Sequence, residues 1–140
     1  MTRIIPLLVA ILVASSLAPQ PVMSSDAVIE LLRLEVPATQ RQVWLAAEQR
    51  TWQPWLEDQD GFLGRDLYWD PQLQQGVLLI RWNSHDQWKA ITPEAVEQVQ
   101  QRFDATVRSA LGQSESSEPR SPFPLVMEGE LIVQRLPGDD

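Results

Sequence analysis

An uncharged apolar run near the start of the sequence limits what the rest of it can fold into. Residues 4–18 read IIPLLVAILVASSLA behind Arg3, and a polar stretch then continues to Ser25. This order is typical of a secretory signal peptide, and the run is shorter than the about 20 residues that a membrane span needs. We therefore predict a signal segment at residues 1–25 and an exported protein.

The cleavage position of this segment stays open. Ser16 and Ala18 favour a cut after Ala18, but Pro19 would then follow the cut directly, so a site near Ser24 fits equally well. Retention of the segment as a membrane tether is the alternative. The predicted location is the periplasm or another extracytoplasmic compartment.

The rest of the chain, residues 26–140, suffices for one domain with a modest core. The formal net charge of −8 becomes −9 without Arg3, which disfavours nucleic acid as a partner.

The chain has no Cys and one His, which excludes disulfides, thiolate metal sites and clusters of histidines. Glu57, Asp58 and Asp60 are interpreted as a solvated turn. We predict no metal and no cofactor.

Four segments have the composition of β-strands. The last of them has Leu125, Met127, Leu131 and Val133 on one face. The predicted strands are residues 27–36, 62–69, 77–82 and 125–136.

Two longer helices and one helical turn are predicted between these strands. Thr39 and Gln42 have the spacing of a capping box before a helix over 41–56, which should bend or end near Pro54. The same spacing recurs at Ser84 and Gln87, before a helical turn.

The second long helix has the clearest signals. Thr92 precedes Pro93 as an N-cap precedes a proline in the first helical position, and Gly112 ends the pattern. Between them, the apolar residues Val96, Val99, Phe103, Val107 and Leu111 form one stripe.

The order strand, helix, strand, strand, helix, strand predicts an α+β fold of the ferredoxin-like, split βαβ type. This is a four-stranded antiparallel sheet with both helices on one face. The expected domain core is 26–112, followed by a flexible loop at 113–122, the final strand at 123–136 and a polar tail at 137–140. Because the other face of the sheet is also apolar, we predict a homodimer packed through it, a dimeric α/β barrel.

Three motifs carry a resemblance to a known family. Gly-Phe-Leu-Gly at 61–64, Leu-Leu-Ile-Arg-Trp at 78–82 and Ser-x-x-Gln-Trp-Lys at 84–89 resemble the antibiotic-biosynthesis-monooxygenase-like superfamily of dimeric α/β barrels. Within it, the stretch from Val28 to Leu111 is similar to a group of uncharacterised exported cyanobacterial proteins. These motifs are mostly structural, so they bear on the fold more than on the function.

The resemblance implies a pocket between the sheet and the helices that takes a flat aromatic molecule or haem. The candidate catalytic residues are His85 and Asn83, and the candidate ligand-binding residues are Arg65, Tyr68, Arg81, Trp52 and Trp88. Each has a structural alternative: a solvated histidine, a turn asparagine, arginines in ion pairs across the sheet, and tryptophans that fill the core.

The haem-degrading branch of the superfamily relies on an Asn, a Trp and a His that this sequence lacks at the matching positions. The Asn position falls among Leu31, Leu32 and Arg33, the Trp position falls near Ile91, and the helix over 94–111 contains no His. Trp88 is a displaced equivalent at best, and core packing explains it better.

The function predicted from the sequence is a non-catalytic module of monooxygenase-like fold that binds a small apolar or aromatic molecule or serves as a structural part. The first alternative is a cofactor-free monooxygenase that acts on an aromatic substrate with His85 as its base. The second is a protein-interaction module that uses the acidic surface and the loop at 113–122.

Overall fold

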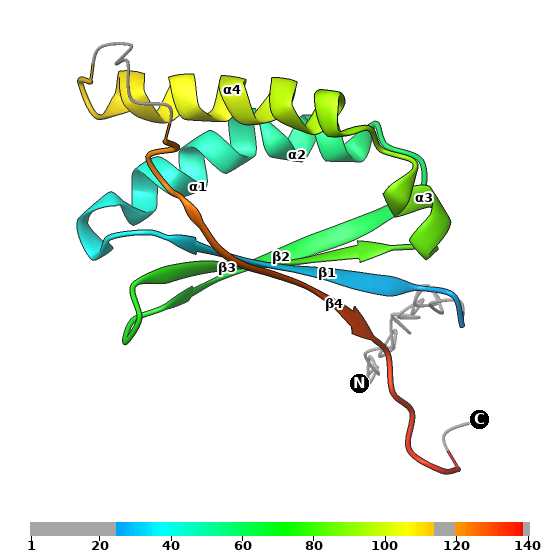
Figure 1. Ribbon diagram of the computed structural model, residues 1–140. Coiled ribbons are helices and arrows are strands. Elements are labelled where there is room, and N and C mark those ends of the chain that lie inside the picture. The colour runs from blue at the N-terminus through cyan, green and yellow to red at the C-terminus, as the bar shows by residue number, and fades with distance from the viewer. Residues whose placement is uncertain (1–24, 114–119, 139–140) are drawn as a thin grey trace, which may run out of the picture.

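A four-stranded antiparallel sheet carries the helices α1, α2 and α4 on one side (Figure 1). The computed structural model describes residues 25–113 and 120–138. The predicted α+β, ferredoxin-like fold is confirmed, with a short helix added after the third strand. The elements are β1 (Val28–Glu35), the 3-10 turn η1 (Ala38–Gln40), α1 (Arg41–Arg50), α2 (Trp52–Glu57), β2 (Phe62–Asp70), β3 (Gln75–Trp82), α3 (His85–Lys89), α4 (Pro93–Ala110) and β4 (Leu125–Ile132).

The strands lie in the order β2-β3-β1-β4, so β1 is internal and β2 and β4 are the edges. Val28 of β1 pairs with Trp82 of β3 on one side and with Ile132 of β4 on the other. Residues that lie opposite each other in antiparallel strands share a face of the sheet. The register therefore assigns side chains either to the side that faces the helices or to the uncovered side, called the open face below.

The core lies between the sheet and the helices. Burial alternates along β3: Leu78, Ile80 and Trp82 are buried beneath the helices, while Val77 and Leu79 belong to the open face. The helical layer contributes Trp44, Ala47 and Leu56 from α1 and α2, and Val99, Phe103 and Val107 from α4. These side chains supply most of the apolar burial that stabilises the fold.

The helix predicted over 41–56 is two helices that meet at Thr51. The N–H and the Oγ1 of Thr51 both donate to the carbonyl of Ala47, at 3.0 and 2.7 Å. The break puts Pro54 in the first turn of α2, where its missing N–H leaves no hydrogen bond unmade. The cap predicted from Thr39 is wrong, because neither η1 nor α1 has a side-chain cap and residues 38–40 form a 3-10 turn instead.

The other two predicted helix starts are confirmed. Ser84 Oγ accepts from the N–H of Gln87 at 3.1 Å, and Thr92 Oγ1 accepts from the N–H of Ala95 at 3.2 Å, with Pro93 as the first residue of α4. These contacts satisfy amide groups that have no partner within the helix. They fix where α3 and α4 begin relative to the end of β3.

Phe123 anchors the chain just before β4. Its side chain is buried, with its ring centroid 6.2 Å from that of Phe103 on α4. Nearby, Ser121 Oγ donates to Asp104 Oδ1 at 2.6 Å. β4 itself ends at Ile132, four residues before the predicted end, and every one of its residues except Gly129 is exposed.

Two sequence predictions lie wholly or largely outside the described residues. They are the signal segment, of which residues 1–24 are not described, and the loop at 113–122, of which 114–119 are not described. Within the part of the chain that is described, no helix has the length and apolarity to span a bilayer.

Candidate functional site

Glu30 is a charged residue on the helix-facing side of β1, among Val28, Leu32 and Leu34. Its Oε2 accepts a hydrogen bond of 3.0 Å from the indole Nε1 of Trp82, which is itself buried. Burial raises the pKa of the Glu30 carboxyl above its ordinary value, and the Trp82 hydrogen bond only partly opposes this. An inward carboxyl with a raised pKa is suited to exchanging a proton with a bound molecule.

Helix α3 brings a histidine and a tryptophan to the same end of the sheet. The Nε2 of His85 lies 3.5 Å from Glu130 Oε2 on β4. The His85 ring stands edge-on to that of Trp88, with 6.0 Å between centroids. Lys89 Nζ lies 3.7 Å from the centre of the Trp88 ring, and the charge of Lys89 also acts on Glu30. We call Glu30, Trp82, His85, Trp88 and Glu130 the α3 corner.

Carboxylates predominate at this corner. Glu30 pairs directly with Glu130 in the β1–β4 register, and Glu128 follows on the same side of β4, opposite Leu32. Glu128 contributes to the raised pKa of Glu30. Like charges opposite each other in a sheet are destabilising. The corner therefore favours a neutral or cationic molecule with a hydrogen-bond donor and disfavours an anion.

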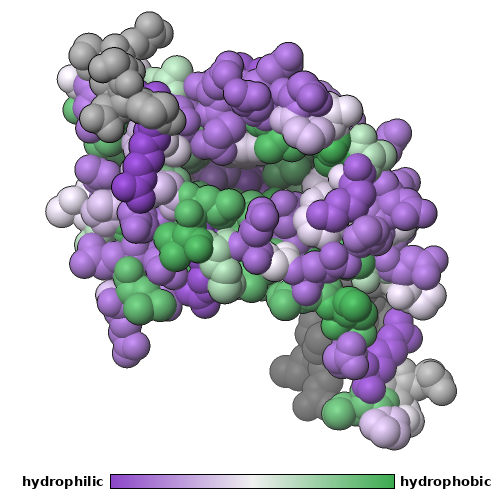
Figure 2. Space-filling model, viewed as in Figure 1, coloured by the Kyte–Doolittle hydropathy of each residue, from purple (hydrophilic) through white to green (hydrophobic). Residues whose placement is uncertain are grey.

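A recess is visible between the helical layer and the sheet on the side of β4, with hydrophobic residues along its sheet-side border (Figure 2). Glu30, Glu128 and Glu130 all belong to the side of the sheet that faces the helices. Trp88 adds a partly buried aromatic ring to the same layer, packed against the core in which Trp82 is buried. Acceptor oxygens and aromatic rings are thus combined in one region, as in many small-molecule sites.

Asn83, the second candidate catalytic residue, lies beside His85 but has a structural use. Its N–H donates to the carbonyl of Gly61 at 2.7 Å, and its Nδ2 donates to Gln87 Oε1 at 3.0 Å. These bonds tie the start of α3 to the β2 end of the hairpin. Asn83 therefore orients the helix that carries His85 and Trp88.

Arg65 faces the helices but is fully engaged in the core. Its NH1 lies 2.6 Å from Glu48 Oε2, its Nε donates to Gln53 Oε1 at 2.7 Å, and only 3% of its side chain is exposed. Glu48 Oε1 also accepts from Trp44 Nε1 at 3.2 Å. Trp52 packs edge-on against Trp55, with 5.6 Å between centroids. These contacts are the kind that a structural role implies: Arg65 is held in a buried ion pair, and Trp52 packs against another tryptophan.

Tyr68 and Arg81 lie on the open face, away from the other candidates. Tyr68 pairs with Val77 and Arg81 pairs with Ile29, and both partners belong to that face. Arg81 forms an ion pair with Asp66 on β2. The seven candidate residues are therefore divided between the two sides of the sheet, and of them only His85 and Trp88 lie in the α3 corner.

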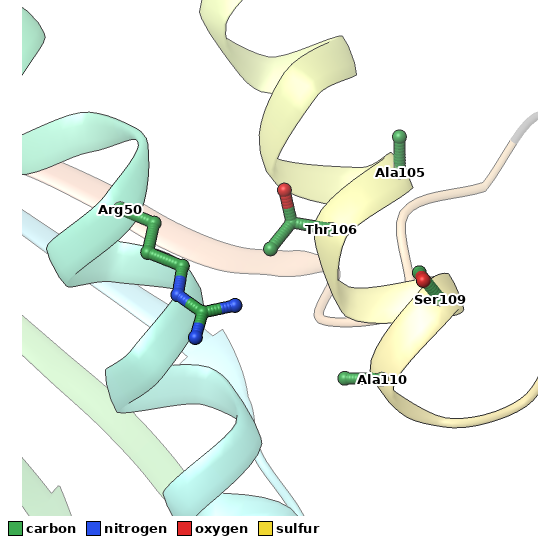
Figure 3. Close-up of a pocket in the computed structure, with 5 residues that line it drawn as sticks. All are labelled: Arg50, Ala105, Thr106, Ser109 and Ala110. Carbon is green, nitrogen blue, oxygen red and sulfur yellow. The ribbon is translucent and has the colours of Figure 1, made fainter.

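A separate shallow groove of about 480 Å³ lies between α1 and α4 (Figure 3). The guanidinium of Arg50 extends from α1 toward α4, where Ala105, Thr106, Ser109 and Ala110 form the opposite wall. Its lining has no aromatic ring and no carboxylate. The groove lacks the chemical groups that the α3 corner combines. Within the described ranges, no group of three or more His, Asp or Glu residues is arranged to hold a metal ion.

Sequence reasoning missed Glu30 and Glu130. The available signal was a charged residue at an inward position of a strand otherwise apolar on that side, as Glu30 is among Val28 and Leu32. Its partner Trp82 is 52 residues away in the sequence. Only the strand register brings the two together.

Comparison with known proteins identifies the fold. The sequence matches no family model and no curated protein. Among solved structures, a protein from Bordetella bronchiseptica described as an antibiotic biosynthesis monooxygenase superposes with a TM-score of 0.54. The identity is 14%, over 79% of this chain and 98% of the other.

Two further structures have the same fold. One is described as a monooxygenase from Shewanella loihica, with a TM-score of 0.51 and 16% identity over 81% of this chain and 99% of that one. The other is SnoaB, a cofactor-independent oxygenase from Streptomyces nogalater, with a TM-score of 0.50 and 13% identity over 81% and 99%. The fold is therefore that of the antibiotic-biosynthesis monooxygenases, and at these identities the likeness extends to the fold alone.

Proposed function

We propose that this chain binds a small aromatic molecule with a hydroxyl or amino donor at the α3 corner and releases it unchanged. The observation that carries the proposal is the Glu30 carboxylate, which faces the helical layer and is held there by the buried indole of Trp82. A partly buried carboxylate with one hydrogen bond retains lone pairs for a donor from a ligand. The partly buried ring of Trp88, at the same corner, suits a flat partner.

The chemistry of the corner predicts an order of affinity among three molecules of similar shape. Naphthol offers a hydroxyl donor, naphthalene offers none, and naphthoate brings a negative charge toward Glu30, Glu128 and Glu130. We expect naphthol to bind most tightly and naphthoate least, as measured by calorimetric titration. Equal affinities for the three would contradict the proposal.

A variant pair locates the binding. Glu30→Gln keeps an acceptor oxygen for Trp82 but loses the charge, and we expect it to weaken naphthol binding several-fold. Glu97→Gln makes the same change on an exposed position of α4 and should leave the affinity unchanged. Unchanged naphthol binding in Glu30→Gln would exclude the α3 corner as the site.

The second candidate function is cofactor-independent oxygenation of the bound aromatic molecule. It is favoured by the raised pKa of Glu30 beside His85 and Glu130, and by the fold shared with SnoaB, a cofactor-independent oxygenase. A corner base would remove a proton from the substrate, whose electrons would then reduce O2. An activated CH2 group would become a carbonyl, with one oxygen atom retained and the other released as water.

Oxygen consumption separates the two functions. The oxygenase predicts uptake of O2 with a phenolic substrate that carries an activated CH2 group, and loss of that uptake in His85→Ala with the fold intact. Asn83→Ala, which removes a hydrogen bond at the start of α3, should reduce the O2 uptake less than His85→Ala does. Under the binding function, the same substrate is recovered unchanged and no oxygen is consumed.

We also propose that the chain acts as an exported homodimer. The open face carries the apolar residues Ile29, Leu31, Val77 and Leu79 from the two inner strands, and Tyr68, Met127 and Leu131 from the edges. A surface of this kind is suited to packing against an identical copy about a two-fold axis. The apolar run at 4–18 supports export, and the narrower similarity to exported cyanobacterial proteins is part of the same proposal.

A further inference from the structure

The segment from Leu125 to Leu136 concentrates the exposed apolar surface of the described chain. Of the twelve large hydrophobic side chains that are exposed, seven lie in this segment: Leu125, Val126, Met127, Leu131, Ile132, Val133 and Leu136. Hydrophobic residues follow the course of β4 in Figure 2. So high a local concentration is unusual for a surface that meets only water.

The outer edge of β4 is open for strand pairing. β4 is hydrogen-bonded to β1 on one side, and among the described residues no strand lies on its other side. In Figure 1 the outer edge of β4 faces away from β1, and none of the labelled helices lies along it. An unpaired row of N–H and C=O groups flanked by apolar side chains is a template for an added strand.

A dimer packed through the open face would not cover this edge. Met127 and Leu131 belong to the open face, because they pair with Arg33 and Ile29. Ile132 pairs with Val28, which is buried beneath the helices, so Ile132 belongs to the opposite side. Leu125 pairs with Leu34, which also faces the helices, so Leu125 lies on that side too. The edge therefore has its own apolar surface, which needs a separate occupant.

Charge on the edge determines which strand it fits. Glu128 and Glu130 lie between the apolar Leu125 and Ile132 on the helix-facing side of β4. A second copy of β4, paired antiparallel about Gly129, would place each Glu128 opposite a Glu130. Like charges in that position are destabilising, whereas a lysine or arginine there is stabilising.

We propose that the outer edge of β4 binds an extended segment of another protein that pairs antiparallel and carries basic residues opposite Glu128 and Glu130, with apolar residues on either side. The backbone hydrogen bonds of the added strand supply affinity, and the two carboxylates supply selectivity. Gly129 leaves room on the open face, where an added Cβ would meet only Leu31 Cδ2, at 3.9 Å. An aromatic residue opposite Gly129 would cover that space.

These positions define a probe peptide with the core Val-Leu-Lys-Phe-Lys-Leu-Val. Its lysines lie opposite Glu130 and Glu128, and its phenylalanine lies opposite Gly129. The matched control replaces both lysines with glutamate and keeps everything else. With a fluorescent label and the full-length protein, anisotropy should show saturable binding of the lysine peptide, weaker in high salt. The glutamate peptide should bind at least about tenfold more weakly.

A charge swap tests the assignment to β4. The double variant Glu128→Lys, Glu130→Lys should lose the lysine peptide and gain the glutamate peptide. The control Glu94→Lys, Glu97→Lys makes the same change of net charge on α4 and should keep the original preference. Because all four positions are exposed, the thermal unfolding of both variants should remain cooperative.

Two results would overturn the proposal. One is that the lysine peptide does not bind, whether the edge of β4 stays empty or a second copy of the chain occupies it. The other is that it binds but the charge swap leaves its affinity unchanged. Titration with naphthol, measured separately, reports on the α3 corner, so failure of either proposal is distinguishable from failure of the other.

Discussion

The indole of Trp44 lies directly on Gly76. A Cβ at residue 76 would lie 2.7 Å from Cζ2 of Trp44, closer than real contacts allow. The absence of a side chain at Gly76 is thus what lets α1 pack close to the start of β3. The same contact keeps the Trp44 side chain almost completely buried, at 1% exposure.

Gly76→Ala should therefore lower the free energy of unfolding by about 1–3 kcal/mol, because the added methyl group overpacks the layer between α1 and the sheet. Urea denaturation measures the change. Gly129→Ala is the matched control in another strand, where the nearest atom to an added Cβ is 3.9 Å away. It should leave stability unchanged or raise it slightly. Equal losses in the two variants would show that Trp44 is not the cause.

The two arginines of the hairpin should behave differently. Arg65→Met leaves Glu48 as an unpaired buried carboxylate and should cost about 3–5 kcal/mol. Arg81→Met breaks a pair with Asp66, whose side chain is half exposed, and should cost at most about 1 kcal/mol. Urea denaturation compares the two. A double variant, Arg65→Met with Glu48→Met, should lose less than the two single variants combined.

The stability of the wild-type protein should depend on pH through Glu30. Its pKa is raised in the folded state, so the folded protein disfavours the charged form and loses stability as pH rises from the ordinary carboxyl value of 4.5 through the folded pKa. Glu30→Gln removes this cost. The variant should be more stable than the wild type near neutral pH, and the difference should vanish below 4.5. Denaturation curves at several pH values test this, and a difference that does not vary with pH would count against it.

A charge in the middle of the open face should prevent dimer formation. Leu79 pairs with Leu31 at the centre of that face. In sedimentation, Leu79→Glu should be a monomer at concentrations where the wild type is a dimer. Leu73→Glu, at an exposed position of the β2–β3 turn, should remain dimeric. A wild-type monomer at about tens of micromolar would contradict the dimer itself.

The order of the elements could be predicted because its signals are local. Alternation along β3 and the Ser84 and Thr92 caps each depend on residues within a few positions of one another. The sequence predicts the bend in the first helix near Pro54, whereas the two helices meet at Thr51. A proline shows only that its own N–H is missing, and the break can precede it by a turn.

The site was harder to predict because it depends on the register. Arg65 and Arg81 are on neighbouring strands, as expected, but a bulge between Phe62 and Gly64 aligns Gly64 with Arg81 and Arg65 with Ile80. The two arginines therefore face opposite sides of the sheet. A single residue of register decides between these arrangements, and the sequence does not reveal it.

The position of β1 inside the sheet has a consequence for synthesis of the chain. β1 is the first of the described strands to be made, yet both of its neighbours, β3 and β4, are made later, and Val28 must await first Trp82 and then Ile132. Pairing across such separations is slow. Until β3 is complete, the growing chain presents β1 as an unpaired apolar strand, and until β4 is complete one edge of β1 stays open to capture by a neighbouring chain.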